Sequence, residues 1–471
     1  MLFNSLHFLI FIPIVTAIFF ALGKLKNRRF WLLIASWYFY ASWKPEFLLL
    51  LITSTLVDYF AGIRLEKTQN RSGRIFLLLL SLTVNLGLLA AFKYVGFVDY
   101  NLQRFIGTSA LFQGHSFEYL VLPIGISFYT FQTISYTIDV FKRKQKAEHN
   151  FVKFALYVSF FPQLVAGPIE RASNLLPQFD KLPKINYKRI TSGLKLMFWG
   201  FFQKLVIADN MALLVDSVYS NPGSYYGLDI MLATLFFAVQ IYGDFSGYTD
   251  IARGTARVMG IELRLNFSRP YFAKSITEFW QRWHMSLSSW FRDYIYIPLG
   301  GNRVKSNWHW GFNIMVTFVL SGLWHGAGWN FILWGFLHGL YYITERMIVK
   351  PLFSRWSVSV PAALKIITVF VLVNIAWVFF RSESVSVALS LLENMLNITK
   401  TRLNFDHALL ARNVFLIVLL VSVHVLERRQ NIINLISSKH WVVRWSVYYI
   451  SVIMLLVLGN FGIKEFIYFR F

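Results

Sequence analysis

Runs of about 20 mostly apolar residues recur along the chain from one end to the other. Such a run is long enough to cross the hydrocarbon core of a bilayer as a helix, which pairs its own backbone polar groups. Only 15% of the residues are charged, against roughly 25% in a soluble domain, so the chain is not a water-soluble globule. We predict an all-α, polytopic integral membrane protein with about 12 transmembrane helices plus re-entrant or interfacial helices. These helices are expected to form one domain that covers residues 1–471. The expected spans are Ser5–Leu22, Phe30–Trp43, Phe47–Gly62, Ile75–Phe92, Tyr119–Asp139, Leu194–Met211, Leu228–Gly247, Trp308–His325, Trp329–Ile348, Ala362–Phe380, Val414–Leu426 and Val447–Gly462.

The charge of the chain is best explained by membrane topology. The chain has 46 Lys and Arg against 23 Asp and Glu, a formal net charge of +23, without a groove-binding motif that would indicate a nucleic-acid partner. Short cytoplasmic loops of membrane proteins carry the excess of Lys and Arg. Basic connections alternate here with connections poor in positive charge, such as Asp209–Gly227, which places both termini outside the cell. The alternation requires Phe151–Gly167 to enter and leave the membrane on the cytoplasmic side, and Pro162 is compatible with such a turn. The connections expected in the cytoplasm are Lys24–Arg29, Arg64–Arg74, Lys142–Lys153, Arg253–Lys274, Arg346–Arg355 and Arg428–Arg444.

The chain has no cysteine. This excludes disulfides, cysteine-ligated metals, iron–sulfur clusters and an acyl-thiol intermediate on the protein. His284 and His325 stand alone, without a second histidine or carboxylate at the short helical spacing that a metal site needs. We therefore expect no metal.

The segment of about residues 240–345 differs from the rest, because ionisable side chains stand there among dense aromatic residues. Such groups are costly at membrane depth and persist where they pair with one another or line a water-filled cavity, so they are functional candidates by default. The polar residues of this segment are Gln240, Asp244, Ser246, Tyr248, Asp250, Arg253, Glu278, Arg282, His284, Arg292, Asp293, Asn302 and His325.

Ser275 and Glu278 have the spacing of a capping box, which predicts one helix through Asp293. Aromatic and apolar residues would lie on one face of this helix and polar residues on the other. The pattern suits a helix that enters a cavity, and it equally suits an interfacial aromatic belt with a snorkelling arginine. The first face would carry Trp280, Trp283, His284, Leu287 and Trp290.

Three glycines surround His325 in the run Ser321–Trp329 and break a helix inside an apolar segment. The backbone groups freed by such a break need water or substrate, which favours a cavity with His325 on its wall. The alternative is a helical hairpin whose tip leaves His325 near the surface. Histidine suits general-base work because its unperturbed pKa is about 6.5, whereas His338 in the following span is better explained as a packing residue.

Several motifs in order resemble the membrane-bound O-acyltransferases, and in particular the bacterial alginate and peptidoglycan O-acetylases. The resemblance covers essentially the whole chain, and both histidines match. The motifs are Leu122–Gln132, Phe161–Pro168, Gln240–Asp250, Asn266–Tyr271, Phe279–His284, Trp290–Gly301 and Leu323–Gly326.

This resemblance implies that His325 is the catalytic base and His284 the second active-site histidine, both lining a central tunnel through the cell inner membrane. It implies a cytoplasmic thioester donor, acetyl-CoA, and transfer of the acetyl group to a polysaccharide such as alginate or peptidoglycan. Transfer would be direct or through an extracytoplasmic partner of the serine-esterase type. Further candidates for lining or bracing the tunnel are Asp244, Tyr248, Asp250, Arg253, Arg292, Asp293 and Trp324.

The basic residues on the cytoplasmic side suit the phosphates of a coenzyme A donor. Arg253, Arg257, Arg282 and Arg292 are the expected contacts. Two other classes share the composition: an exporter or flippase of a glycan or lipid-linked sugar, and an ion-coupled transporter. In these, substrate would move without any thioester donor.

Overall fold

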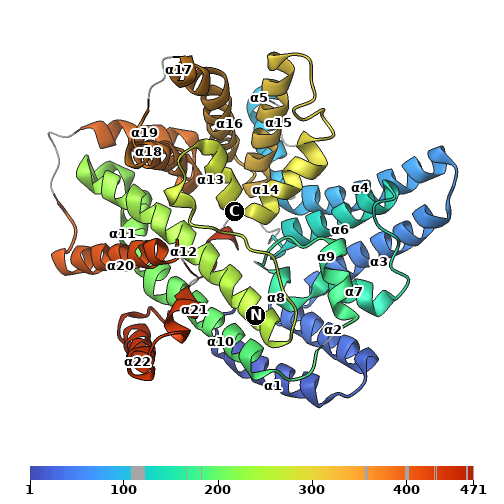
Figure 1. Ribbon diagram of the computed structural model, residues 1–471. Helices are drawn as coiled ribbons and strands as arrows, with labels where there is room; N and C mark the ends of the chain where they lie inside the picture. Colours follow the sequence, from blue (N-terminus) through green and yellow to red (C-terminus); the bar gives the residue numbers. More distant parts are fainter. Residues whose placement is uncertain are drawn as a thin grey trace. The chain divides into compact units, whose positions relative to one another are not determined.

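The computed structural model describes residues 1–107, 122–165, 167–181, 183–355, 359–397, 403–428, 430, 432–462 and 465–469. Every regular element in these residues is helical, which confirms the prediction of an all-α protein. The contacts divide the chain into two compact units, and each is described below by itself (Figure 1). The prediction of a single domain stays a prediction.

The first unit comprises Met1–Leu194 and Ala252–Arg264. Its core contains a buried polar cluster within α3, α4 and α6. The Asp58 carboxylate accepts hydrogen bonds from Ser81, from Thr137 at 2.9 Å and from the Asn85 amide at 2.8 Å. These hydrogen bonds offset the free-energy cost of burying the carboxylate. Because the donors come from α4 and α6, the cluster fixes how these helices pack against α3. The helices of this unit are α1 (Leu6–Ala21), α2 (Leu25–Ala41), α3 (Glu46–Lys67), α4 (Arg71–Lys93), α5 (Val95–Ile106), α6 (Ile126–Phe141), α7 (Phe151–Ser159), α8 (Phe161–Leu164), α9 (Ala172–Phe179) and the first half of α10 (Tyr187–Phe201).

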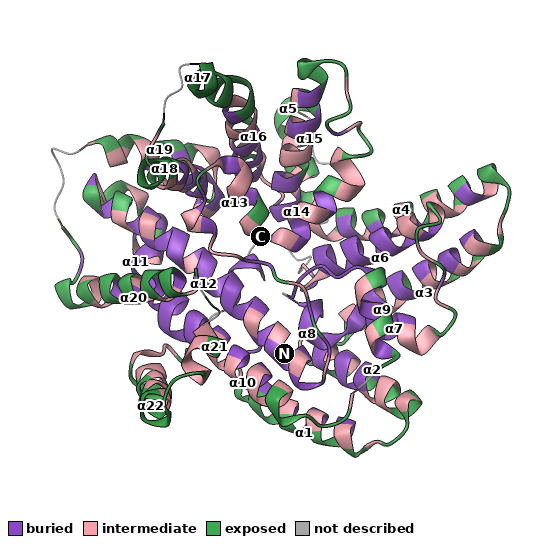
Figure 2. Cartoon of the chain, in the orientation of Figure 1, coloured by how far each residue is buried: buried purple, intermediate pink, exposed green. Residues whose placement is uncertain are grey.

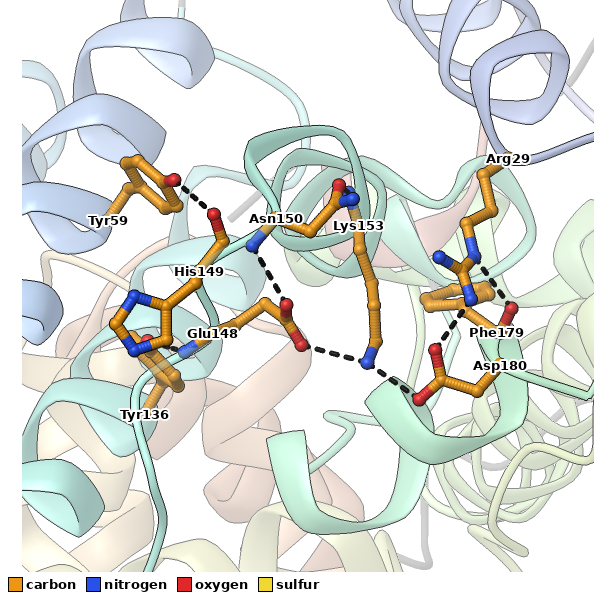
Figure 3. A network of polar contacts seen from close by, with 9 residues as sticks. All are labelled: Arg29, Tyr59, Tyr136, Glu148, His149, Asn150, Lys153, Phe179 and Asp180. Carbon is orange, nitrogen blue, oxygen red and sulfur yellow. Dashed lines mark hydrogen bonds and ion pairs between the residues drawn. The ribbon is translucent and has the colours of Figure 1, made fainter. Parts of the chain in front are cut away.

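A network of polar contacts joins the loop before α7 to its neighbours in this unit (Figure 3). Lys153 lies between the carboxylates of Glu148 at 2.8 Å and Asp180 at 2.7 Å. Asp180 also contacts Arg29 of α2 at 2.5 Å. Two carboxylates thus stabilise the one lysine, and the network fixes the basic Lys142–Lys153 connection against α2 and α9.

The second unit comprises Lys195–Ile251 and Leu265–Phe471. In it, α10 and α12 approach closely at two glycines: a Cβ built on Gly200 would lie 2.6 Å from the Gly247 carbonyl oxygen. Only glycine permits such a distance between helix backbones. The helices of this unit are the end of α10, α11 (Asp209–Ser220), most of α12 (Leu228–Val258), α13 (Ile276–Arg282), α14 (Met285–Phe291), α15 (Asn307–His325), α16 (Trp329–Thr344), α17 (Lys350–Arg355), α18 (Ala362–Arg381), α19 (Val385–Leu396), α20 (His407–Leu426), α21 (Ile432–Ser437) and α22 (Trp441–Leu458), with π-helical turns η2 (Phe202–Ala208), η5 (Arg292–Tyr296) and η6 (Glu345–Val349) and 3₁₀ turns η3 (Pro222–Ser224), η4 (Pro270–Phe272) and η8 (Ile467–Phe469).

Side-chain caps explain where many of these helices begin. Ser5, Asn150 and Asp406 each accept a hydrogen bond from a backbone N–H of the first turn, for example Asp406 from Leu409 at 2.9 Å. Such caps pair N–H groups that have no partner within the helix.

Every predicted span contains a helix over most of its described residues; the first three residues of Tyr119–Asp139 lie outside the described residues. Within the described chain, seven helices are long and apolar enough to cross a membrane: α3, α4, the continuous Tyr187–Ser220 segment, α12, α18, α20 and α22. Among these, α22 has no buried residue, so its apolar surface is open to lipid (Figure 2). The polytopic prediction is confirmed.

Several shorter helices lie between the predicted spans, and α5 and α19 are two of them. The helix α5 fills the start of Tyr94–Glu118, whose later part lies outside the described residues, and α19 lies in the polar stretch Arg381–Arg412. Both are amphipathic and shorter than a span, so their apolar residues are too few to stand out in a hydropathy pattern.

Candidate active site

His325 is the last residue of α15, and three residues separate it from α16, which packs against α15 as the second arm of a helical hairpin. The two helices pack closely because Gly322 and Gly335 face backbone: a Cβ on Gly322 would lie 2.2 Å from the Phe331 carbonyl oxygen. The expected break at the glycines is present. The hairpin alternative is also correct in its geometry, but the tip is buried, and His325 is only 3% exposed.

Aromatic rings enclose the His325 imidazole. The ring centroids of Trp324, Trp334, Phe380 and Tyr468 lie 4.9, 5.0, 5.3 and 5.5 Å from it. These contacts hold the ring in a site from which bulk water is excluded, where electrostatic interactions with a reacting group are strong.

The single helix predicted from Ser275 to Asp293 is wrong. The chain forms α13, breaks at Trp283 and His284, and resumes as α14. The predicted start is correct, since the Ser275 hydroxyl accepts a hydrogen bond from the Glu278 N–H at 3.0 Å. Periodicity did not reveal the break because the residues on either side still have helical spacing.

His284 occupies this break with a left-handed backbone, φ 42°. It is fully buried, and its ring meets Phe245 edge-on at 4.6 Å. Burial lowers the pKa of His284 to about 3, because a charged imidazolium would lose its hydration there. The ring is therefore neutral at physiological pH.

The two histidines share two aromatic neighbours. Trp324 lies 4.9 Å from His325 and 6.1 Å from His284, and Tyr468 lies 5.5 and 6.4 Å from the same two rings, measured between centroids. Residues 41 positions apart in sequence thus converge on one aromatic cluster. His338 is buried among other rings, including Trp280 and Trp334, in agreement with a packing role.

The Tyr468 segment was missed by the sequence analysis. The Ile467 N–H donates to an Asp244 carboxylate oxygen at 2.7 Å, and the Phe466 ring stacks on Tyr248 at 4.6 Å. These contacts bring the C-terminal segment into the cluster. The aromatic residues at the end of the sequence are the feature that could have indicated this segment.

Lys204 was missed as well. Its ammonium lies 2.7 Å from Asp244 and 2.9 Å from Asp209, and its side chain is 1% exposed. A lone lysine in an apolar span is itself a sign of function or pairing, and it could have been selected on that ground.

Two cavities border the hairpin tip of this unit. The first, about 470 Å³, is lined by Ala327 and Phe331 after His325, and by Lys204 and Asp244. The second, about 420 Å³, is lined by Ser321 before His325 and by Met285 next to His284. Neither histidine lines these two cavities itself: residues near His325 in the sequence line both of them, and the residue after His284 lines the second.

The remaining predicted residues differ in their placement. Asp250 accepts a hydrogen bond from Gln203 at 3.1 Å. Arg292 lines the second cavity and pairs with Asp293 at 2.9 Å. Arg253 belongs to the first unit, so it is not grouped with the histidines. Two other expected donor contacts also have carboxylate partners: Arg257 pairs with Glu262 and Arg282 with Glu278.

Comparison with known proteins shows the family of this chain. The family model described as "membrane-bound O-acyltransferase family" matches residues 73–387. The chain belongs to this family. Membership of an acyltransferase family decides against the exporter, flippase and transporter alternatives, and the protein is a multi-pass membrane O-acyltransferase.

The names of similar proteins indicate which members of the family this chain resembles. This acyltransferase is 40% identical over 398 residues to a probable alginate O-acetylase of Pseudomonas aeruginosa, covering 84% of this chain and 75% of the relative. It is 37% identical over 431 residues to a peptidoglycan O-acetyltransferase of Helicobacter pylori, covering 84% and 80%. It is also similar to a teichoic acid D-alanyltransferase of Bacillus subtilis, 28% identical over 248 residues, 50% of this chain and 61% of that protein.

Proposed function

We propose that this acyltransferase moves an acetyl group from a cytoplasmic thioester donor, acetyl-CoA, to an extracytoplasmic polysaccharide in the cell envelope, at the inner membrane. The observation that carries the proposal is the convergence of His325 and His284, both buried, on Trp324 and Tyr468. Sequence neighbours of the two histidines line two cavities. The names of the relatives, alginate O-acetylase and peptidoglycan O-acetyltransferase, support a glycan as the final acceptor.

The chemistry assigns different roles to the two histidines. His325 removes the proton of the acceptor hydroxyl as its oxygen attacks the thioester carbonyl; the C–S bond then breaks, and the proton passes to the leaving thiolate. His284, with a pKa of about 3, is too weak a base for this step at neutral pH. As a neutral imidazole it donates a hydrogen bond to the oxyanion that forms.

The cavities support a two-sided route for the substrates. The second cavity includes Arg292, whose exposed guanidinium suits the phosphates of the donor. The first cavity adjoins Asp216 of the Asp209–Gly227 connection, which carries no positive charge and is therefore expected outside. It is the proposed route to the polysaccharide or to an extracytoplasmic partner of the serine-esterase type.

The test is the variant His325→Ala. Loss of a general base costs about 10²- to 10⁴-fold in rate, roughly 2.7 to 5.5 kcal/mol of transition-state stabilisation. We expect polysaccharide O-acetylation in cells and acetyl-CoA turnover by the purified protein with its partner to fall by that factor, with normal accumulation in the membrane. The matched control is His309→Ala, since His309 lies at the exposed start of the same helix. Near-normal acetylation by His325→Ala would refute the assignment.

A further inference from the structure

The break at His284 is held by a segment from outside the helices it separates. The Ser268 N–H donates to the Arg282 carbonyl at 2.9 Å, and the Met285 N–H donates to the Asn266 carbonyl at 2.9 Å. These two bonds lie on either side of His284. The Asn266–Ser268 segment therefore pairs with the backbone before and after the break.

The Asn266 side chain completes this support. Its Oδ1 accepts a hydrogen bond from the Ser286 N–H at 3.2 Å. The first N–H groups of a helix are normally capped by the side chain of the residue just before it. That residue is His284, and its side chain makes no capping bond. Asn266, fully buried, caps α14 in its place.

The backbone of His284 needs such support. A left-handed conformation at a residue other than glycine costs free energy and persists only where surrounding contacts enforce it. With the N–H groups of Met285 and Ser286 paired to Asn266, the helix starts directly after His284 and the imidazole is directed to Phe245 and Trp324.

We propose that Asn266 is a positioning residue for His284: it caps α14 from a separate segment, and so fixes the left-handed break that presents the imidazole to the aromatic cluster. This inference rests on the proposed role of His284 in acyl transfer. Asn266 then affects the rate of the reaction only because it positions His284.

The Asn266 amide also offers a conservative variant. Its Nδ2 has no hydrogen-bond partner among the described residues, so Asn266→Ser breaks no bond of that nitrogen in this part of the chain and keeps a neutral oxygen that can accept from the Ser286 N–H. By contrast, Asn266→Ala removes that acceptor. Asn266→Leu removes it as well while it preserves the volume of the side chain, and it serves if the alanine variant does not accumulate.

The experiment is a double-mutant cycle on acetyl-CoA turnover by the purified protein with its partner. A misplacement of about 1 Å at a reacting group costs on the order of 10²-fold, so we expect Asn266→Ala or Asn266→Leu to lower kcat by about 10- to 100-fold. Asn266→Ser, whose hydroxyl oxygen can still cap α14, is expected to recover part of that loss. In a His284→Ala background, the same Asn266 substitutions should change kcat by less than about threefold.

Asn413→Ala is the matched control, because Asn413 is a fully buried asparagine of α20 in the same unit. Its effect should multiply with that of His284→Ala. If the effects of Asn266 and His284 multiply in the same way, or if Asn266→Ser is as impaired as Asn266→Ala, the inference is wrong. Absence of thioester turnover by the wild-type protein would instead refute the proposed function, and full activity of His284→Ala would refute the role of that histidine.

Discussion

His284 is neutral in the folded protein, because burial lowers its pKa from 6.5 to about 3. A lowered pKa means that the imidazole gains a proton only as the pH falls towards 3, so no change in its charge occurs between pH 5 and 8. The side-chain amide of a glutamine, which is also neutral, can therefore donate the hydrogen bond in place of the His284 imidazole.

We expect His284→Gln to keep more activity than His284→Ala, and the acidic limb of its pH–rate profile to match that of the wild-type protein. The measurement is acetyl-CoA turnover from pH 5 to 8. An acidic limb present in the wild type and absent from His284→Gln would show that His284 titrates in this range.

Lys204 is held between two buried carboxylates, those of Asp209 and Asp244. Lys204→Met removes the cation from both, and an uncompensated buried charge costs about 3–5 kcal/mol. Asp244→Asn keeps the Lys204–Asp209 pair and an oxygen for the Ile467 N–H. We predict that Lys204→Met lowers the unfolding temperature in detergent and the yield in membranes far more than Asp244→Asn. Equal unfolding temperatures would contradict this account of the ion pairs.

At the scale of elements, the contact of α10 with α12 depends on Gly200 and Gly247. A Cβ on Gly247 would lie 2.7 Å from the Gly200 carbonyl oxygen, and backbone cannot give way as a flexible side chain can. Gly247→Ala should therefore destabilise the protein by about 1–3 kcal/mol.

The control is Gly87→Ala in α4, where a Cβ would meet nothing within 4 Å. Alanine has the higher helix propensity, by about 1 kcal/mol, so this variant should be neutral or stabilised. Both are measured by unfolding temperature in detergent. The same destabilisation in both variants would mean that the close approach of the two helices is not the cause.

At the scale of the whole molecule, the distribution of basic residues predicts which loops face the cytoplasm. The absence of cysteine makes this prediction testable with single introduced cysteines. Lys144→Cys, at an exposed position in a basic loop, should resist a membrane-impermeant thiol reagent in intact cells and react after permeabilisation. Ser224→Cys, exposed in η3, should react in both states. Labelling of Lys144→Cys in intact cells would show that this loop faces the outside, which contradicts the predicted topology.

The sequence by itself determined the helical class, the positions of the main apolar helices and the break after His325. Each of these depends on groups close together in the chain. A helix pairs N–H and C=O groups four residues apart, a cap lies within one turn, and glycine interrupts a helix where it stands. The motifs around His284 and His325 identified the family for the same reason, since they are short and contiguous.

Only the tertiary structure decided the break at His284 and the positions of Lys204 and Tyr468. The capping bond from Ser286 reaches Asn266, 20 residues earlier, and the bond that anchors the Tyr468 segment joins Ile467 to Asp244 across 223 residues. A local pattern of apolar and polar residues contains no information on partners so distant. Whether a buried charge is paired, or a helix interrupted, depends on which donors and acceptors the packing of other segments brings to it.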